Sequence, residues 1–318
     1  MEHHQYHDDR SARTILVMGA LGLDRLLTVE SFPQPDSKVR TTAYSQVGGG
    51  NAANTAEAMA RLGFFQVRLC SKVGSDAIGD ELIQQLATAG VDIEHPLFLR
   101  GPKDSTTAFT TVLVAGDTRT CLHTPGSCGE LTVDDVESAD SVLEGVCHLH
   151  VDGRHTEAAL CLAKAARRRG LPVSLDVEKD RHHPALDELL ELASIVFTNH
   201  GQIEDYLHRL TKEYERREGR SLLKETAARG RPENWLEFYA HVLQPSAFFT
   251  RWHKQLGKEV VITLGDQGAV HVQCQALRDN GEPSDPPATN VMVVDASSSS
   301  SSSSPAVTIH HDSVEMNP

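Results

Sequence analysis

The sequence predicts an α/β protein built on a mostly parallel sheet, with a smaller β-sheet beside it. Short apolar runs typical of buried strands alternate with amphipathic segments of helical spacing, which is the pattern of a parallel sheet covered by helices. Two β-rich segments interrupt this alternation and predict the smaller sheet. The chain has 318 residues, of which 39% are hydrophobic, so it can bury a sizeable core.

The first half of the chain begins with two strand–helix pairs. Residues 14–18 form an apolar run ended by Gly19, which predicts a buried strand. Residues 51–62 carry apolar side chains three and four positions apart and are followed by a glycine, which is typical of a helix and its C-terminal cap. The same order predicts a strand at 67–73 and a helix at 80–89.

The second half alternates more regularly. Its segments predict strands at 146–151, 172–177, 194–198 and 259–264, and helices at 156–169 and 184–192. His148 and His150 fall on one face of the first of these strands, where paired histidines are more often packed or hydrogen-bonded than catalytic.

The segments that break the alternation predict a small β-sheet lid. Residues 38–47 are polar but β-tolerant, and 106–114 and 118–123 are β-rich runs joined by Ala-Gly-Asp, a hairpin signal. We therefore expect lid strands near 24–47 and 105–124. Because ligands of open α/β sheets bind beyond the carboxyl ends of the strands, such a lid would lie near the site. Cys121 and His123 are interpreted as lid residues rather than as a nucleophile–base pair.

Three segments are expected to lie outside a folded domain of residues 14–295 or to interrupt it. Residues 1–13 are polar and rich in histidine, which predicts a disordered tail. Residues 202–258 are charged and helix-prone, which predicts an inserted helical excursion. Residues 296–318 begin with an alanine and a run of serines that cannot bury apolar surface, so we expect a disordered tail.

Composition excludes several classes of protein. The formal net charge is −14, which argues against a nucleic-acid partner because such proteins carry a basic face. No apolar run approaches the roughly 18 residues of a membrane helix, so no membrane partner is expected. The six cysteines are scattered without a CxxC pair, which favours free thiols in a reducing compartment and a cytoplasmic location.

The most informative motif is the glycine-rich segment Gly48-Gly49-Gly50-Asn51-Ala52-Ala53-Asn54. Glycines before a helix let the backbone approach a ligand closely, and Asn51 and Asn54 place two amides on one helix face. Amides that both donate and accept suit the hydroxyls of a sugar, and Asp24 adds a carboxylate that accepts from hydroxyls. The alternative is a glycine turn in which an asparagine caps the helix.

Five segments together resemble the PfkB/ribokinase family of carbohydrate kinases over residues 14–295. They read GALGLD (19–24), DSKVRTTAYSQVGGGNAANTAEAMARLG (36–63), HLHVDGR (148–154), VSLDVEK (173–179) and VITLGDQGAV (261–270). The middle motifs are particularly similar to a ketohexokinase-like branch. A Rossmann dehydrogenase competes poorly because Gly19-Ala-Leu-Gly22 lacks the GxGxxG spacing.

The resemblance implies a ribokinase-like three-layer α/β sandwich with a β-lid, which transfers the γ-phosphoryl group of ATP to a sugar or related alcohol. It implies Mg²⁺ as a cofactor. Separately from the resemblance, the edges of the expected lid strands could pair between subunits and so form a homodimer. Carried over by motif, the residues expected to bind the acceptor are Asp24, Gly49, Gly50, Asn51, Asn54, Asp152 and Arg154. Those expected near the nucleotide are Thr263, Gly265 and Gly268, and the metal candidates are Asp176 and Glu178. The alternative for the last two is an exposed acidic strand end.

The family's DTxGAGD-type motif is missing. Its glycines open a helix that forms an anion hole, and its final Asp takes the proton of the acceptor hydroxyl. Asp295 matches the first Asp of that motif, but alanine and serines follow it and no GAGD occurs in the chain, so no catalytic residue is assigned. Three explanations stay open: a truncated or mispredicted C-terminus, a pseudokinase that binds sugar or nucleotide without turnover, or substitution by an Asp such as Asp312. The last is disfavoured because a flexible tail cannot preorganise a base.

Overall fold

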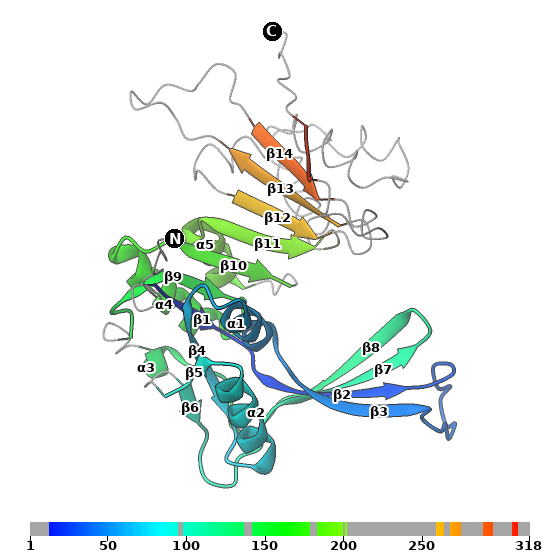
Figure 1. The fold of residues 1–318 in the computed structure, drawn as a ribbon. Helices are drawn as coiled ribbons and strands as arrows, with labels where there is room; N and C mark the ends of the chain where they lie inside the picture. Colours follow the sequence, from blue (N-terminus) through cyan, green and yellow to red (C-terminus); the bar gives the residue numbers. More distant parts are fainter. Residues whose placement is uncertain are drawn as a thin grey trace, which may run out of the picture. The chain divides into compact units, whose positions relative to one another are not determined.

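The computed structural model describes most of the first two hundred residues and short pieces of the remainder (Figure 1). The described residues are 13–94, 98–136, 142–178, 183–199, 201, 259–263, 268–274, 289–294 and 307–310. The chain divides into two compact units, residues 1–173 and 174–318, and each is described by itself. The helical excursion expected at 202–258 and the N-terminal tail, apart from Arg13, lie outside the described residues.

The first unit is built on a parallel sheet centred on strand β1 (Thr14–Met18). Strands β4 (Gln66–Val73) and β9 (Val146–Val151) pair with β1 in parallel on its two sides. Two short strands, β5 (Val91–Asp92) and β6 (Phe98–Arg100), pair with β4. All five residues of β1 are buried, so both faces of the sheet are covered there, as a layered α/β arrangement requires.

Helices pack on this sheet as the apolar spacing predicts. Helix α1 (Asn51–Leu62) and helix α2 (Ala77–Thr88) share one core cluster with side chains of β1 and β4. Helix α4 (Thr156–Arg168) contacts β9 and buries alanines and leucines along one face. A single helical turn, α3 (Val133–Val136), packs against α4. The expected strand and helix at 14–18 and 51–62 are therefore confirmed.

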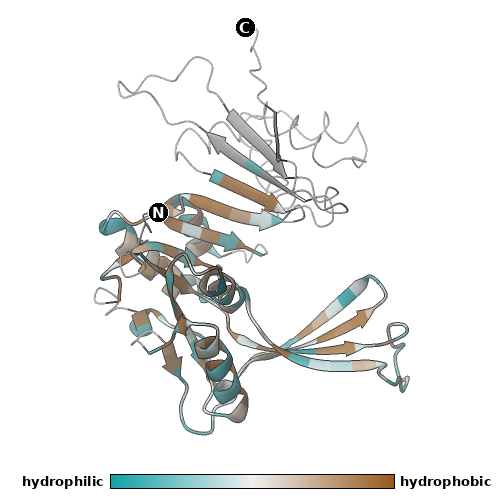
Figure 2. Ribbon diagram, in the orientation of Figure 1, coloured by the Kyte–Doolittle hydropathy of each residue, from teal (hydrophilic) through white to brown (hydrophobic). Residues whose placement is uncertain are grey.

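The second sheet of this unit has four strands in the order β3-β2-β7-β8. They are β2 (Gly22–Thr28), β3 (Ala43–Gly49), β7 (Phe109–Ala115) and β8 (Thr118–Thr124). All of β8 and most of β3 are exposed, and Figure 2 shows these two strands paler or more hydrophilic than much of β2 and β7. The expected hairpin and small sheet are confirmed.

The described residues of the second unit include helix α5 (Pro184–Leu192) and six strands. Strands β10 (Val173–Val177), β11 (Ile195–Asn199) and β12 (Glu259–Thr263) pair in parallel. Strands β13 (Ala269–Cys274), β14 (Thr289–Val294) and β15 (Val307–His310) continue the sheet in antiparallel fashion.

Two expectations need correction. Strand β15 lies inside the segment expected to be disordered, and it pairs with β14 through Val307–His310, so that expectation is wrong for these four residues. Helix α2 begins at Ala77 rather than at residue 80, because the Asp76 side chain caps it by accepting from the Gly79 N–H at 3.0 Å. Among the described residues, the longest and most apolar helices still fall short of what a bilayer crossing requires.

Candidate functional site

The turn after β9 supplies a buried carboxylate that ties three chain segments together. Asp152 is 1% exposed. Its side chain accepts hydrogen bonds from the Ala20 N–H at 2.7 Å, the Ala52 N–H at 3.1 Å and the Arg154 N–H at 2.9 Å. The carboxylate therefore holds the ends of β1 and β9 against the first turn of α1.

Glycine 19 makes room for this carboxylate. A Cβ at Gly19 would lie 2.0 Å from Asp152 Oδ1, and the backbone there has a φ of +153°, which other residues rarely adopt. Burial raises the pKa of Asp152, and the three N–H donors oppose that rise by favouring the charged form. A negative side chain at the N-terminus of α1 also interacts favourably with the helix dipole. In the structure Asp152 therefore stabilises the backbone by accepting from three N–H groups. That it also contacts the acceptor remains a prediction.

The glycine-rich segment ends β3 and begins α1. Gly50 is the N-cap residue, with a φ of +100° and no side-chain hydrogen bond to the cap. The Ala53 N–H donates to the Ala20 carbonyl at 3.2 Å and the Ala52 N–H donates to Asp152, so groups outside the helix accept from these two donors of the first turn. The alternative in which an asparagine caps the helix is therefore wrong. Asn51 is half-buried and Asn54 is exposed, one turn apart on α1.

Asp24 lies near the start of β2, an inner strand of the small sheet between β3 and β7. Its carboxyl group lies against Gly49, where a Cβ would approach Asp24 Oδ2 to 2.3 Å. Partial burial raises the pKa of Asp24, while a hydrogen bond from the Thr110 side chain and the charge of His123 act in the opposite direction. Because Gly49 has no side chain, the Asp24 carboxylate can lie directly against the backbone of β3.

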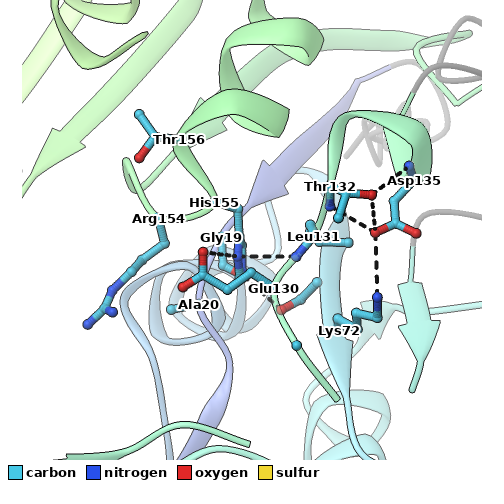
Figure 3. Close-up of polar contacts among 12 residues, drawn as sticks. Gly19, Ala20, Lys72, Glu130, Leu131, Thr132, Asp135, Arg154, His155 and Thr156 are labelled. Carbon is cyan, nitrogen blue, oxygen red and sulfur yellow. Dashed lines mark hydrogen bonds and ion pairs between the residues drawn. The ribbon is translucent and has the colours of Figure 1, made fainter. Parts of the chain in front are cut away.

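The segment after Asp152 carries the expected Arg154 and also His155, which the sequence motifs did not single out (Figure 3). His155 has a φ of +52°, and its Nδ1 accepts from the Leu131 N–H at 3.3 Å. The Glu130 carboxylate lies 3.8 Å from the same nitrogen. In Figure 3 the half-buried Arg154 side chain extends away from His155. These contacts fix the turn that carries Arg154.

A second polar anchor joins α2 to the segment that leads into β7. Asp76 accepts from both the N–H of Thr107, at 2.9 Å, and its hydroxyl, at 2.6 Å. Burial would raise the pKa of Asp76, but these bonds and the one from Gly79 outweigh it and hold the pKa below its usual value. Nearby, Lys72 pairs with Asp135, as Figure 3 shows.

In the second unit, the candidates Asp176, Glu178 and Thr263 lie at the carboxyl ends of parallel strands. Asp176 lies on β10 and Glu178 directly follows it. The Asn199 amide at the end of β11 donates to the Glu178 carbonyl at 3.3 Å, and the Thr263 hydroxyl donates to the Thr198 carbonyl at 3.3 Å. Gly268 has a φ of +98°, whereas Gly265 lies outside the described residues.

The donors at this edge fit Mg²⁺ only in part. Asp176 is half-buried and Glu178 is exposed. Across the described residues, no three His, Cys, Asp or Glu side chains gather into a metal-binding group. Mg²⁺ commonly keeps several waters and binds one or two carboxylates together with substrate phosphates. Two carboxylates at a strand end suit that mode, and they do not form a closed metal cage.

The strand histidines are packed, as expected. His148 and His150 pair in register with Ile15 and Val17 and therefore share one face of the sheet. Burial lowers the pKa of both, that of His150 to about 4, with a smaller contribution from His148. The described cysteines whose side chains are placed are free, at positions 70, 121, 128, 147 and 161.

Comparison with known proteins identifies the group of proteins to which these features belong. The sequence pattern of the pfkB family carbohydrate kinases matches residues 12–232. An ATP-dependent ribose-1-phosphate kinase of Halopiger xanaduensis is 28% identical over 185 residues, which cover 58% of this chain and 61% of that protein. A nucleoside kinase of Methanothermobacter thermautotrophicus is 26% identical over 202 residues, which cover 63% of this chain and 64% of that protein. The chain thus spans about three fifths of these relatives.

The fold is similar to that of solved ribokinases. A ribokinase of Cryptococcus neoformans var. grubii in complex with ADP superposes with a TM-score of 0.60 at 22% identity, covering 82% of this chain and 76% of that one. This similarity shows the expected ribokinase-like α/β fold, with its mostly parallel central sheet and separate small sheet. Because the family pattern covers more than half of the residues, the chain belongs to the pfkB family of carbohydrate kinases.

Proposed function

We propose that the protein is a carbohydrate kinase of the pfkB type, which transfers the γ-phosphoryl group of ATP to a hydroxyl of a sugar or related small alcohol, and that the 318-residue sequence lacks the catalytic Asp segment which this step requires. The first unit would bind the acceptor, and the second would contribute to binding ATP and Mg²⁺. Within the family we assign it to the ketohexokinase-like branch, on the motifs of its middle segments.

The observation that supports the proposal most directly is the position of the Asp24 carboxylate against Gly49. A half-buried carboxylate lies against a glycine that cannot bear a side chain without displacing it. The same glycine-rich segment leads directly into α1, whose first turn carries Asn51 and Asn54. A carboxylate that accepts and amides that donate and accept are the groups that recognise neighbouring hydroxyls. Arg154, on the turn held by Asp152, is the further acceptor-binding candidate.

The nucleotide side of the proposal rests on the carboxyl ends of β10, β11 and β12. Thr263, Gly265 and Gly268 would let the chain lie against the nucleotide, and Asp176 and Glu178 would hold Mg²⁺ directly or through its waters. Bound ATP and Mg²⁺ would supply the phosphoryl group and neutralise its charge. This chain's own residues would orient the two substrates.

A second candidate function keeps the acceptor site without phosphoryl transfer. Asp24 and the asparagines can hold an acceptor, but no residue of the printed sequence matches the family's proton-accepting Asp. The second candidate is therefore a catalytically inactive protein that binds sugar or nucleotide, with truncation of the gene product as its variant. Both candidates require the same acceptor site.

The deciding experiment compares binding with turnover. The 318-residue chain is titrated calorimetrically with ribose, fructose and a nucleoside, and ATP-dependent phosphorylation of the same panel is measured in parallel. We expect saturable binding of at least one acceptor, weakened by Asn54→Ala, and phosphorylation near background. Phosphorylation should appear when a GAGD-bearing C-terminal segment is added. Phosphorylation by the 318-residue chain would contradict the claim that its sequence lacks the catalytic base. If none of the panel binds, the proposed acceptor site and the proposed function are wrong.

The small sheet also supports a proposed homodimer. Its outer strands are β3 and β8, and exposed apolar side chains on them include Tyr44, Val47 and Leu122. Strand edges with apolar neighbours favour pairing with a second copy. Sedimentation should show a dimer that Leu122→Lys dissociates, and a wild-type monomer would contradict the assignment. The free described cysteines favour a cytoplasmic location.

A further inference from the structure

A row of polar side chains crosses three strands of the small sheet and ends at Asp24. Asp24 on β2 pairs in register with Thr110 on β7, and Thr110 pairs in register with His123 on β8. Residues in register project to the same face of a sheet. The three side chains therefore form one cross-strand row. On the other side Asp24 pairs in register with Val47 on β3, and its carboxyl group lies against Gly49, two residues further along that strand.

The side chains of the row are neighbours. Thr110 Oγ1 lies 3.3 Å from His123 Nδ1, and strand register places the Thr110 side chain beside Asp24, where its hydrogen bonding opposes the rise in the pKa of Asp24. Asp24 and Thr110 are partly buried, whereas His123 is exposed on β8. A carboxylate seated inside the sheet is thus linked to a titratable ring at its rim.

The direction of the protons along this row follows from the chemistry of the groups. An ionised carboxylate only accepts, and a threonine hydroxyl has a single proton to donate. A Thr110 hydroxyl that donates to Asp24 has no second proton, so its oxygen can only accept from His123. This requires a proton on Nδ1 of His123, in the neutral ring as well as in the charged one.

Other charged groups do not replace His123 in this arrangement. Alternation along β8 puts Cys121 and Arg119 on the same face, but Arg119 lies four residues away, about 13 Å along the strand. On the opposite face, a Cβ at Gly48 would approach Gln85 and Leu82 of α2, so α2 lies away from Asp24. The side chains that act on the Asp24 carboxylate are those of Thr110 and His123.

We propose that His123 is a positioning residue for acceptor binding, which orients the Asp24 carboxylate through the Thr110 hydroxyl. One side of the carboxylate is then occupied by Thr110, and its remaining lone pairs are directed away from the row, where acceptor hydroxyls can donate to them. The inference rests on the proposed function, because it assigns Asp24 to the acceptor. No family motif in the sequence marks Thr110 or His123 for this role.

The first test needs no ligand. Nitrogen-15 NMR of the histidine rings in the full chain distinguishes the proton on Nδ1 from that on Nε2. We expect neutral His123 to carry its proton on Nδ1 and to lose this preference in Thr110→Val. A proton on Nε2 in the wild-type chain would overturn the relay, whatever the protein binds.

The second test measures the dissociation constant of ribose, or of the best acceptor in the panel above, by calorimetry. Thr110→Val and His123→Ala should each weaken binding about tenfold, the cost of losing one hydrogen bond in a row that ends on a charged group. His123→Asn should restore much of the affinity, because its side-chain amide can donate from nearly the position of Nδ1. Cys121→Ala, on the same strand and face, is the matched control and should bind like the wild type.

The outcomes separate the inference from the proposed function. If the wild-type chain binds an acceptor and His123→Ala binds it equally well, the positioning role is overturned and the function stands. Equal losses in His123→Ala and His123→Asn would likewise overturn it, because the donated hydrogen bond would then be irrelevant. If the wild-type chain binds no acceptor, the proposed function fails and the positioning role fails with it.

Discussion

Two aspartates in the first unit have the same expected role in the sequence motifs but different surroundings in the fold. Asp152, at the end of β9, is 1% exposed and accepts from three backbone N–H groups. Asp24, in the small sheet, is half-buried and has a side-chain hydroxyl and a histidine as its neighbours. Both were expected to bind the acceptor.

The difference shows how the surroundings of a carboxylate set its role. A buried carboxylate whose lone pairs are taken by backbone donors stabilises the local fold and has little capacity left for a ligand. A partly exposed carboxylate with one side-chain donor keeps capacity for hydroxyls. Substitution of Asp152 is thus expected to lower the free energy of unfolding, and substitution of Asp24 is expected to weaken acceptor binding.

The largest expected effect comes from removing the Asp152 carboxylate. Asp152→Ala leaves the buried N–H of Ala52 and the partly buried N–H groups of Ala20 and Arg154 without their acceptor and should lower the free energy of unfolding by about 3 kcal/mol or more. Urea unfolding followed by circular dichroism measures it. A loss below about 1 kcal/mol would show that Asp152 does not hold the turn.

Acid should weaken the same region through His150. The pKa of His150 falls from 6.5 to about 4 on folding, so the unfolded chain binds more protons between these values and stability falls as the pH falls from 6.5 to 4. The total contribution is about 3 kcal/mol. Asp152, whose pKa is raised, acts in the opposite direction, so the comparison is made against His150→Gln. The difference in unfolding free energy between the wild-type chain and this variant should shrink steadily over that range, and a constant difference would contradict it.

A smaller effect is expected at Gly19. Gly19→Ala would place a Cβ 2.0 Å from Asp152 Oδ1 and should cost about 2 kcal/mol through displacement of the carboxylate. Gly63→Ala is the matched control, because Gly63 also has a positive φ but a Cβ there would meet nothing within 4 Å. Its cost should be about 1 kcal/mol from backbone strain alone. Equal losses of unfolding free energy in the two variants would show that the Asp152 carboxylate does not pack closely against Gly19.

The sequence predicted those elements whose signals are local. Continuous apolar runs predicted β1 and β9, and alanine-rich helical spacing with Gly63 at its end predicted α1. Strand β2 was not assigned bounds because Asp24 and Arg25 interrupt its apolar residues, and pairing on both sides stabilises it instead. The start of α2 was predictable, since Asp76 three residues before Gly79 is a capping signal.

The candidate site was predictable only as a set of residues. The glycine and asparagine motif indicated which groups gather near α1, but the role of Asp152 depends on contacts with Ala20 and Ala52 that lie 132 and 100 residues away in sequence. The row from Asp24 to His123 depends on strand register, which no local pattern fixes. The roles of these residues therefore became visible only from strand pairing and hydrogen bonds between segments that are distant in the sequence.

The most direct test of these two roles is one variant measured in two ways. Asp24→Asn removes the charge of the small-sheet carboxylate while keeping its size, and both the ribose dissociation constant and the free energy of unfolding are measured beside Asp152→Ala. The two roles predict that Asp24→Asn weakens binding about tenfold or more while its unfolding free energy stays within about 1 kcal/mol of the wild-type value. Unchanged binding, or a loss of stability as large as that of Asp152→Ala, would contradict them.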